Sequence, residues 1–432
     1  MGAPDKIKSR DESAAEMAKV RRTLGPGSNP PPASFFGSEV EGLPTEEILV
    51  NVGPSHPVTH GTVRFLIRFD GETIAAIDPE IGYLHRGFEK QVEAATWTQA
   101  FPYTDRLNYV SPMLNNVGYA MAVEKLIGIE APPRAQNIRT FVGEIHRICD
   151  HLTAIAAMAL ELGAMTAFLY AVEMRDHWYD RIAELTGARL MVSYCRVGGL
   201  ARDIPDDQWV PKVRECLKRT LEIVRELDAL LTRNRIFIDR TRDTGIINAE
   251  DAIDWGFTGP CLRATGVDYD VRKDHPYLLY GELDWDVPVG ERGDNYDRYL
   301  VRMEEMRQSV RIVEQCLDRL PDGPIIIDDW RWAKPAKTDV YHSIQGTIAH
   351  FELVMYGMQV PAGEAYGYTE GANGELGFYV VSDGGGKPYK CKVRSPCLSL
   401  MQALPSMVTG SLIADLVPTF DSINMIGGEI DR

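Results

Sequence analysis

The sequence predicts an α+β protein in which a bundle of long helices forms the centre and β-hairpins lie on either side of it in the chain. Two observations support this prediction. Four long segments carry apolar side chains at the 3.6-residue helical period, and such helices bury their apolar faces against one another. Segments before and after them alternate apolar and polar residues between glycine-rich turns, which is typical of paired strands.

The composition is that of a globular protein with a large core. The chain has 432 residues, of which 44% are hydrophobic and 25% charged. Its formal net charge of −16 argues against nucleic-acid binding, because that function needs a basic surface.

The seven cysteines are scattered and form no CxxC pair, so they indicate neither a disulfide framework nor a set of cluster ligands. We therefore expect a reducing, cytosolic compartment. No apolar run reaches the roughly 18 residues of a membrane span, and no signal peptide is visible.

Residues 1–45 are expected to form a disordered or extended N-terminal arm. Residues 6–24 are charged and could form a short helix, and residues 25–32 are rich in glycine and proline, as in an extended linker. Two interpretations remain open: a disordered tail, or an arm that docks on a neighbouring subunit.

Residues 46–110 are expected to be rich in β-structure. Residues 47–52 and 63–69 read as two strands, and the turn between them places His56 and His60 at a hairpin tip. The two imidazoles either bond to nearby carbonyl groups in a structural turn or serve a function there. They could bind zinc, but no third ligand is evident nearby.

Residues 111–335 are expected to form the helical bundle, with helices at residues 136–162, 165–185, 212–233 and 296–320. In the first of these, Glu144, Arg147 and Asp150 are expected to form a solvated or interhelical ion-pair face. His146 and His151 lie about 140° apart around the same helix, so they do not converge on one metal. We interpret both as residues of its polar face.

Residues 336–432 are expected to form a C-terminal α/β region. Residues 338–356 read as a helix, and residues 374–382 and 389–394 as the strands of a hairpin. A further helix is expected at residues 398–416, kinked or split by Pro405. The chain contains no Walker A loop, no GxGxxG after a strand, no HExxH and no GxSxG.

Several motifs resemble one family. Residues 53–61 read GPSHPVTHG, which resembles the GPxHPxxHG pattern of the hydrogenase-like D-type subunit (the 49-kDa-type subunit) of respiratory complex I, NADH-quinone oxidoreductase. The resemblance covers roughly residues 46–432. Its further matches, in order, are GYLHRG at 82–87, DRLNY at 105–109, AVEKL at 122–126, GAMT at 163–166, GAR at 187–189, GDNYDR at 293–298 and GEIDR at 428–432.

The resemblance implies the fold of a nickel-iron hydrogenase large subunit without its metals. Those enzymes hold their metals through RxCxxC and DPCxxC motifs. Here residues 106–111 resemble the first motif with both cysteines replaced, and residues 424–429 stand where the second would lie. Soft metals need thiolate ligands, so we expect no metal or other cofactor bound by this chain alone. In the family, a quinone headgroup occupies the vacated cavity as substrate.

The resemblance also implies which residues act on the quinone. Reduction to quinol needs two electrons and two protons, so the headgroup needs hydrogen-bond donors. His60 and Tyr109 are expected to supply them, with His56 as a further substrate contact. A carboxylate on the long helix is expected to pair with the histidine; the family usually has Asp there, and this chain has Glu161.

Electrons are expected from a tetranuclear iron–sulfur cluster in an adjacent subunit, near Arg86 and Arg106, which match cluster-proximal arginines of the family. Their alternative role is ordinary ion pairing. The implied partners are the cluster-bearing B-type, the C-type, the ferredoxin-like I-type and the membrane H-type subunits. NAD would be engaged only by the whole complex, on the cytoplasmic face of a bacterial inner membrane, with this subunit peripheral.

Two residues depart from the family pattern. Met191 stands where a histidine commonly follows Gly-Ala-Arg, and methionine cannot take up a proton when the cluster is reduced. The expected lower cluster potential would suit a low-potential quinone such as menaquinone. Ser55 stands where glutamine is frequent. Two alternative functions remain: a related oxidoreductase fed by ferredoxin or deazaflavin, and a metal-free structural subunit that bridges other subunits.

Overall fold

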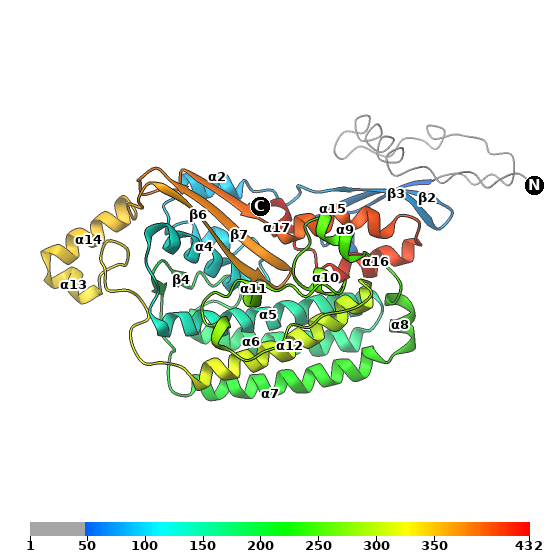
Figure 1. Ribbon diagram of the computed structural model, residues 1–432, viewed down its shortest axis with the longest axis horizontal. Coiled ribbons are helices and arrows are strands. Elements are labelled where there is room, and N and C mark those ends of the chain that lie inside the picture. The colour runs from blue at the N-terminus through cyan, green and yellow to red at the C-terminus, as the bar shows by residue number, and fades with distance from the viewer. Residues whose placement is uncertain (1–47) are drawn as a thin grey trace, which may run out of the picture.

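The computed structural model describes residues 48–432, which combine a bundle of long helices with small antiparallel sheets (Figure 1). The predicted α+β class is confirmed. The closer likeness to a hydrogenase large subunit stays a prediction, and the predicted arm at residues 1–45 lies outside the described residues. Within residues 48–432, no helix is both long enough and apolar enough to span a bilayer.

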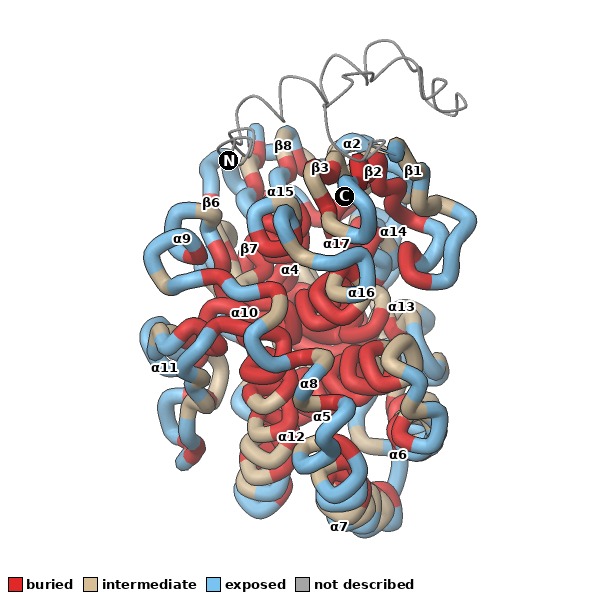
Figure 2. The backbone as a smooth tube through the Cα atoms, turned by 90° about the vertical axis from the view of Figure 1, so that its right-hand side faces the viewer, coloured by how far each residue is buried: buried red, intermediate tan, exposed pale blue. Residues whose placement is uncertain are grey.

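Helix α5 (Pro133–Glu161) is the centre of the bundle. It packs against α6 (Met165–Thr186) and α12 (Asn295–Asp318), and α7 (Trp209–Leu227) packs against both of these. Figure 2 shows α5 buried along most of its length. All four helices fall where the apolar periodicity predicts them, and α7 continues into a π-helical turn, η3 (Asp228–Thr232).

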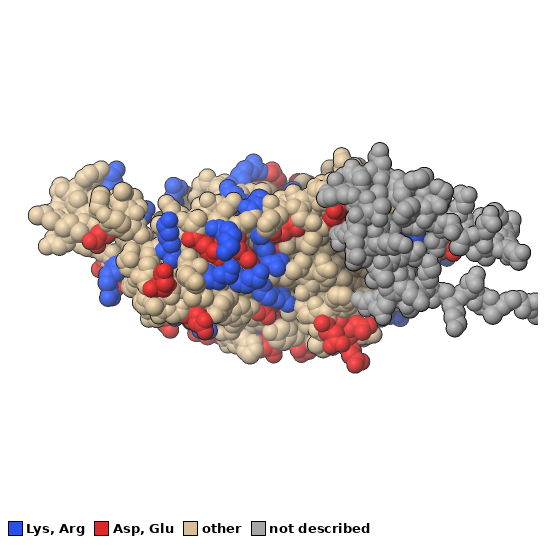
Figure 3. Space-filling model, turned by 90° about the horizontal axis from the view of Figure 1, so that it is seen from above, with Lys and Arg blue, Asp and Glu red and all other residues tan. Residues whose placement is uncertain are grey.

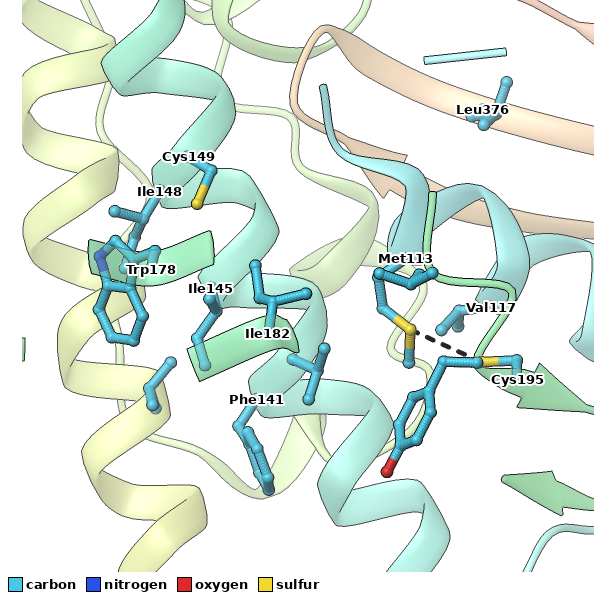
Figure 4. Close-up of a cluster of buried hydrophobic side chains, with 14 of the residues drawn as sticks. Met113, Val117, Phe141, Ile145, Ile148, Cys149, Trp178, Ile182, Cys195 and Leu376 are labelled. Atoms are coloured by element: carbon cyan, nitrogen blue, oxygen red, sulfur yellow. Dashed lines mark hydrogen bonds between the residues drawn. The ribbon is translucent and has the colours of Figure 1, made fainter. Parts of the chain in front are cut away.

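The apolar stripe of α5 forms much of the main core. Figure 4 shows Phe141, Ile145 and Ile148 of α5 on the side of the helix where Trp178 and Ile182 of α6 lie. All five side chains are buried. Burying each large apolar side chain contributes about 1.5–3 kcal/mol, so this shared stripe holds the bundle together.

The polar face of α5 is buried as well, which corrects the interpretation of a solvated face. Glu144 accepts hydrogen bonds from Arg147 and from Arg272. His151 Nε2 lies 2.7 Å from Glu305 Oε2 of α12, and burial lowers the pKa of His146 to about 4. The Glu144–Arg147 pair lies within α5, whereas Arg272 and Glu305 pair with it from other helices.

A three-stranded antiparallel sheet, β6 (Gly363–Gly371), β7 (Gly374–Ser382) and β8 (Lys390–Arg394), covers α4 (Pro112–Ile127). Strands β7 and β8 fall where the sequence predicts them. Strand β6 pairs with β7 along its whole length, but it and α4 are absent from the sequence-based prediction.

A second antiparallel sheet, in the order β1 (Ile48–Val52), β2 (Arg64–Asp70), β3 (Thr73–Glu80), confirms the predicted N-terminal hairpin and adds a third strand. It shares a separate apolar core with residues from the C-terminal part of the chain. The buried members include Val63, Phe65 and Ile67 from the sheet and Leu400, Phe420 and Met425 from the far end of the sequence.

Three C-terminal helices complete this second core: α15 (Pro396–Val408), α16 (Ile413–Ser422) and α17 (Gly427–Asp431). The prediction that Pro405 kinks or splits a helix at 398–416 is wrong about the place of the break. Pro405 lies inside α15, and the chain leaves the helix after Val408, where Gly410 adopts a positive φ of 88°. A conformation that favours glycine ends the helix there.

The predicted helix at 338–356 is two helices, α13 (Lys337–His342) and α14 (Ile344–Met355). Ser343 separates them because its hydroxyl group caps α14 by accepting a hydrogen bond from Gly346 N at 3.2 Å. The remaining elements are short: α2 (Phe88–Ala94), α3 (Phe101–Thr104), α8 (Arg235–Thr241), α9 (Ala249–Asp254), α10 (Gly259–Arg263), α11 (Val271–Asp274), η2 (Pro57–Thr59), η4 (Tyr280–Glu282), β4 (Cys195–Arg196) and β5 (Gly199–Leu200).

Candidate functional site

The loop between β1 and β2 holds its two histidines differently. The ring of His56 caps η2, because its Nδ1 accepts a hydrogen bond from Val58 N at 3.3 Å. His60 ends η2 with a left-handed φ of 52° and an exposed side chain. Thr59 ties the loop together by donating to the carbonyl groups of Pro54 and His56 at 3.0 and 3.1 Å. Strained backbone of this kind is often found at functional sites.

Tyr109 lies in a turn that buried polar side chains hold in place. Asp105 accepts hydrogen bonds from Asn116 Nδ2 and from the backbone and side chain of Ser193. Asn108 Oδ1 accepts from Val110 N at 3.1 Å. These bonds fix both ends of the turn, so the position of the partly buried Tyr109 ring is set by its neighbours.

A stretch at residues 425–428 lies between the histidine loop and the Tyr109 turn. Thr62 Oγ1 is 3.8 Å from Met425 Sδ, and a Cβ atom on Gly427 would lie 2.8 Å from Thr62 Cβ. A Cβ atom on Gly428 would lie 2.4 Å from the carbonyl oxygen of Arg106. Only glycine fits both contacts, through which residues near His60 and near Tyr109 touch one strip of backbone.

Glu161, at the end of α5, lies close enough to His60 to influence its charge. Partial enclosure of the His60 ring lowers its pKa, and the negative charge of Glu161 acts in the opposite direction. The structure therefore brings together the two residues that the sequence pairs, although Glu161 replaces the family's shorter Asp. The ring of His60 also makes an edge contact with Phe420 of α16, with centroids 6.3 Å apart.

The surroundings of Tyr109 keep its hydroxyl group protonated. Burial raises its pKa, and the neighbouring Cys397 and Asp150 raise it further. The backbone of Gly427 and the guanidinium of Arg86 act in the opposite direction. A protonated phenol can donate a hydrogen bond to a carbonyl oxygen, which is the chemistry predicted for this residue.

A buried polar cluster behind Tyr109 is missing from the predicted site. Asp150 accepts hydrogen bonds from Ser111 Oγ and Asn424 Nδ2, both at 2.8 Å. The Cys397 thiol donates to Glu429 Oε2 at 3.2 Å, and burial raises the pKa of Glu429 to about 7. The only sequence signal for this cluster is the match at residues 424–429 to a former metal motif.

Asp421 of α16 is a second residue that sequence reasoning missed. Its side chain is buried, and neither carboxylate oxygen has a hydrogen-bond partner among residues 48–432. Burial raises its pKa well above the usual range, and the charge of Glu161 raises it further. Its position in an amphipathic helix gives no sequence signal that it faces the site.

Arg86 and Arg106 line one open hollow of about 980 Å³, together with residues of α2 and α3. Arg86 donates to the carbonyl oxygen of Arg106 at 2.7 Å. The loop that carries Arg86 is fixed by Asp431, whose carboxylate accepts from Gly82 N and Leu84 N at 2.9 and 2.7 Å. These bonds join the GYLHRG and GEIDR segments in space.

Basic side chains gather on the same side of the molecule. Figure 3 shows Lys and Arg side chains on the upper face, in the part where Figure 1 places α2. Lys390 and Lys392 of β8 pair with Glu93 and Glu89 of α2. The hollow and its arginines therefore lie in a region of mixed charge, although the whole chain is strongly acidic.

Met191 and Ser55 lie at the edges of this region. Met191 is partly buried and lies two residues before Ser193, whose hydroxyl group is bonded to Asp105, the neighbour of Arg106. Ser55 is exposed in the histidine loop. No group of three or more His, Cys, Asp and Glu side chains within residues 48–432 is arranged to hold a metal ion.

A family model and several known proteins resemble this chain, and their descriptions agree with one another. A family model described as respiratory-chain NADH dehydrogenase, 49 Kd subunit, matches residues 161–432. The D-type subunit of NADH-quinone oxidoreductase from Myxococcus xanthus is 57% identical over 413 residues, which cover 95% of this chain and 99% of that protein. The second D-type subunit of Anaeromyxobacter sp. (strain K) is 57% identical, covering 95% and 96%. A combined C/D-type subunit of the same enzyme from Bdellovibrio bacteriovorus is 49% identical, covering 92% of this chain and 70% of that protein.

Proposed function

Because the chain belongs to the family of the 49-kDa subunit of respiratory-chain NADH dehydrogenase, also named the D-type subunit of NADH-quinone oxidoreductase, we propose that it forms the quinone-headgroup site of that complex. As a member of this family it is part of a multisubunit oxidoreductase, complex I, and works with the other subunits. The observation that carries the proposal is the strip of residues 425–428, which contacts both the His60 loop and the Tyr109 turn.

His60 and Tyr109 would each donate a hydrogen bond to one carbonyl oxygen of the quinone. Tyr109 is suited to this role because its surroundings hold the hydroxyl group in the protonated form. Glu161 would support a positive charge on His60 through its own negative charge. His56 already accepts a bond from Val58 N, so it would position the loop and contact the substrate with the rest of its ring.

Electrons would enter from a tetranuclear iron–sulfur cluster held by a neighbouring B-type subunit. The hollow lined by Arg86 and Arg106 supports a docking position there, and two guanidinium groups would favour the reduced, more negative cluster. When bound, the cluster supplies single electrons. This chain's part would be to hold those two positive charges at the hollow, where Arg86 also acts on Tyr109.

Other complex I subunits are partners of this chain, and we assign their types as follows. A C-type subunit is supported by the Bdellovibrio relative, whose name joins C and D in one chain. I-type and H-type subunits would be further neighbours of this chain. The chain would then be peripheral on the cytoplasmic face of a bacterial inner membrane, and NAD would react only elsewhere in the complex.

A photoreactive short-chain quinone analogue tests this proposal in the purified complex. We expect labelling by mass spectrometry near residues 56–62 and 105–111, and protection from labelling by excess unmodified quinone. His60→Ala should lower both labelling and NADH-driven quinone reduction. Labelling confined to other subunits, together with full quinone turnover in His60→Ala, would show that the site lies elsewhere.

A further inference from the structure

Asp421 has a buried titratable side chain that has no role in the proposed function. Its side chain is 5% exposed, and neither of its oxygens bonds to any residue between 48 and 432. Buried polar groups nearly always have hydrogen-bond partners, and an unpaired buried carboxylate is very costly. The least costly state of Asp421 in this position is the neutral carboxylic acid.

The position of Asp421 connects it to the His60 end of the site. Its neighbour Phe420 is the residue whose ring meets the His60 ring, with centroids 6.3 Å apart. Helix α16, which carries both residues, packs against α5, whose last residue is Glu161. The three ionisable groups Asp421, Glu161 and His60 therefore lie around one junction of α16, α5 and the histidine loop.

Charged groups on the elements around α16 have other partners. Arg240 of α8 donates to Asp415 and to the carbonyl group of Ala414, and Arg298 of α12 donates to Ser422 Oγ. Arg302 of α12 contacts Cys261 Sγ at 3.7 Å. The charge that acts on Asp421 is that of Glu161, and its sign is repulsive. A nearby negative charge disfavours a second one, so it favours the neutral form of Asp421.

We propose that Asp421 stores a proton as a neutral carboxylic acid and delivers it, by way of Glu161, to His60 during quinone reduction. The inference rests on the proposed function. The inference adds to that function a source inside this chain for the proton that His60 donates.

Two electrons from the neighbouring cluster reduce the quinone, one proton leaves an N–H group of His60 and one leaves the Tyr109 hydroxyl group, and two O–H bonds form on the quinol. The loss of the His60 proton leaves the charge of Glu161 uncompensated. The O–H bond of Asp421 then breaks and its proton passes through the Glu161 carboxylate to the His60 nitrogen. Solvent finally returns one proton to the Asp421 carboxylate and one to the Tyr109 phenolate.

Asp421→Asn in the whole complex tests the proposal, because Asn has nearly the same shape and cannot release a proton. We expect NADH-driven reduction of a short-chain quinone analogue to fall by at least about tenfold. Reduction of the cluster by NADH, followed by electron paramagnetic resonance, should stay unchanged. Redox-induced infrared difference spectra should lose a carbonyl band of a protonated carboxylic acid that the native complex shows.

Asp415→Asn is the matched control, since Asp415 lies on the same helix and pairs with Arg240 away from the site. It should keep both the turnover and the infrared band. Native turnover and an unchanged band in Asp421→Asn would overturn the proposal. If that variant does not assemble, Asp421→Leu replaces it, and a native complex without any redox-linked carboxylic-acid band also overturns the proposal.

Tyr109→Phe and His60→Ala distinguish this inference from the proposed function. If both variants lose quinone turnover while Asp421→Asn keeps it, the quinone site stands and the proton store is wrong. If both keep native turnover, the quinone site itself is wrong, and the role of Asp421 is wrong with it.

Discussion

The surroundings of Tyr109 suit one task, which is the donation of a hydrogen bond by its hydroxyl group. Its ring borders the second apolar core, and its hydroxyl group meets the backbone of Gly427 and the charges of Arg86 and Asp150. Burial and the neighbouring Cys397 and Asp150 raise the pKa of the phenol and keep it neutral, while the contact with the Gly427 backbone helps to orient it.

Tyr109→Phe should sharply lower quinone reduction, because it removes one donor to the substrate and little volume. The expected loss is on the order of 2–4 kcal/mol of transition-state stabilisation. NADH-driven turnover with a short-chain quinone measures it, and the cluster should still be reduced by NADH. The exposed Tyr389→Phe is the control and should be neutral. Native turnover in Tyr109→Phe would remove this residue from the site.

Glu161→Gln should shift the pH dependence of quinone reduction. Enclosure lowers the pKa of His60 and Glu161 opposes that change, so removing the negative charge lowers the pKa further. His60 then loses its proton at a lower pH. The alkaline decline of the pH–rate profile should therefore move to lower pH. A profile that stays in place would show that Glu161 does not act on the group that controls the rate.

Met191→His should introduce a pH dependence into the potential of the neighbouring cluster. Methionine takes up no proton on reduction, whereas a histidine can, with a maximal slope of about 59 mV per pH unit for one electron and one proton. The midpoint should also rise at acidic pH, because a cation favours the reduced cluster. Potentiometric titrations followed by electron paramagnetic resonance at about pH 6 and pH 8 measure the midpoint potential of the cluster in both forms. A steep slope in the native complex would mean that another group carries the coupling.

Some residues of the site could be predicted from the sequence and others could not. His60 and Tyr109 stand in motifs, so their placement beside one strip of backbone could be anticipated from the resemblance. Asp421 and Glu429 could not be predicted as buried carboxyl groups, because their burial results from packing against residues hundreds of positions away. The sequence shows that these residues are acidic, but it does not show that the folded chain shields them from water.

At the scale of elements, α5 shows what periodicity can and cannot reveal. Its apolar stripe predicted the helix, but its polar face could not be recognised as buried. Helix α4 was missed because it is buried on nearly all sides and has no amphipathic stripe. Strand β6 was missed because its glycines and acidic residues read as a loop. Gly367 is needed there, since a Cβ atom would lie 2.5 Å from Ala122 N of α4.

Glu305→Gln should destabilise the bundle far more than Glu304→Gln, although the two residues are neighbours. Glu305 is buried and bonded to His151 of α5 and to Arg263, so its loss leaves a buried cation less compensated. We expect a cost of about 3–5 kcal/mol. Glu304 forms a half-exposed pair with Arg307, which is worth at most about 1 kcal/mol.

Thermal unfolding of the purified complex, together with its yield on assembly, measures both variants. The contrast between the neighbours is the informative quantity, because it separates burial from local helix effects. Equal stability of the two variants would show that the Glu305 pairs contribute no more than a surface pair.

At the scale of the whole molecule, the α13–α14 pair projects from the body, as Figure 1 shows at its left-hand end. Its apolar side chains lie in solvent, which is unusual for a patch of this size. The exposed members are Tyr341, Ile344, Ile348, Phe351, Val354, Met355 and Tyr356. A surface of this kind suits a protein that works within a complex.

Hydrogen–deuterium exchange should show this surface covered in the assembled complex. We expect residues 337–356 to exchange more slowly in the complex than in the separated protein, because neighbouring subunits would bury the apolar side chains and steady the helices. The exposed helix α9 gives a reference for regions that stay in solvent. Equal exchange of residues 337–356 in both forms would contradict the expectation.

The second apolar core can be completed only late in the synthesis of the chain. Thr62 meets Met425 across 363 residues, and the helices that cover the β1–β3 sheet come from the same distant stretch. At about 5–20 residues per second, a ribosome needs roughly 20–70 s to cover that distance. Every new copy thus spends up to about a minute with the apolar face of this sheet open to other nascent chains, so this sheet is where a chaperone would be needed most.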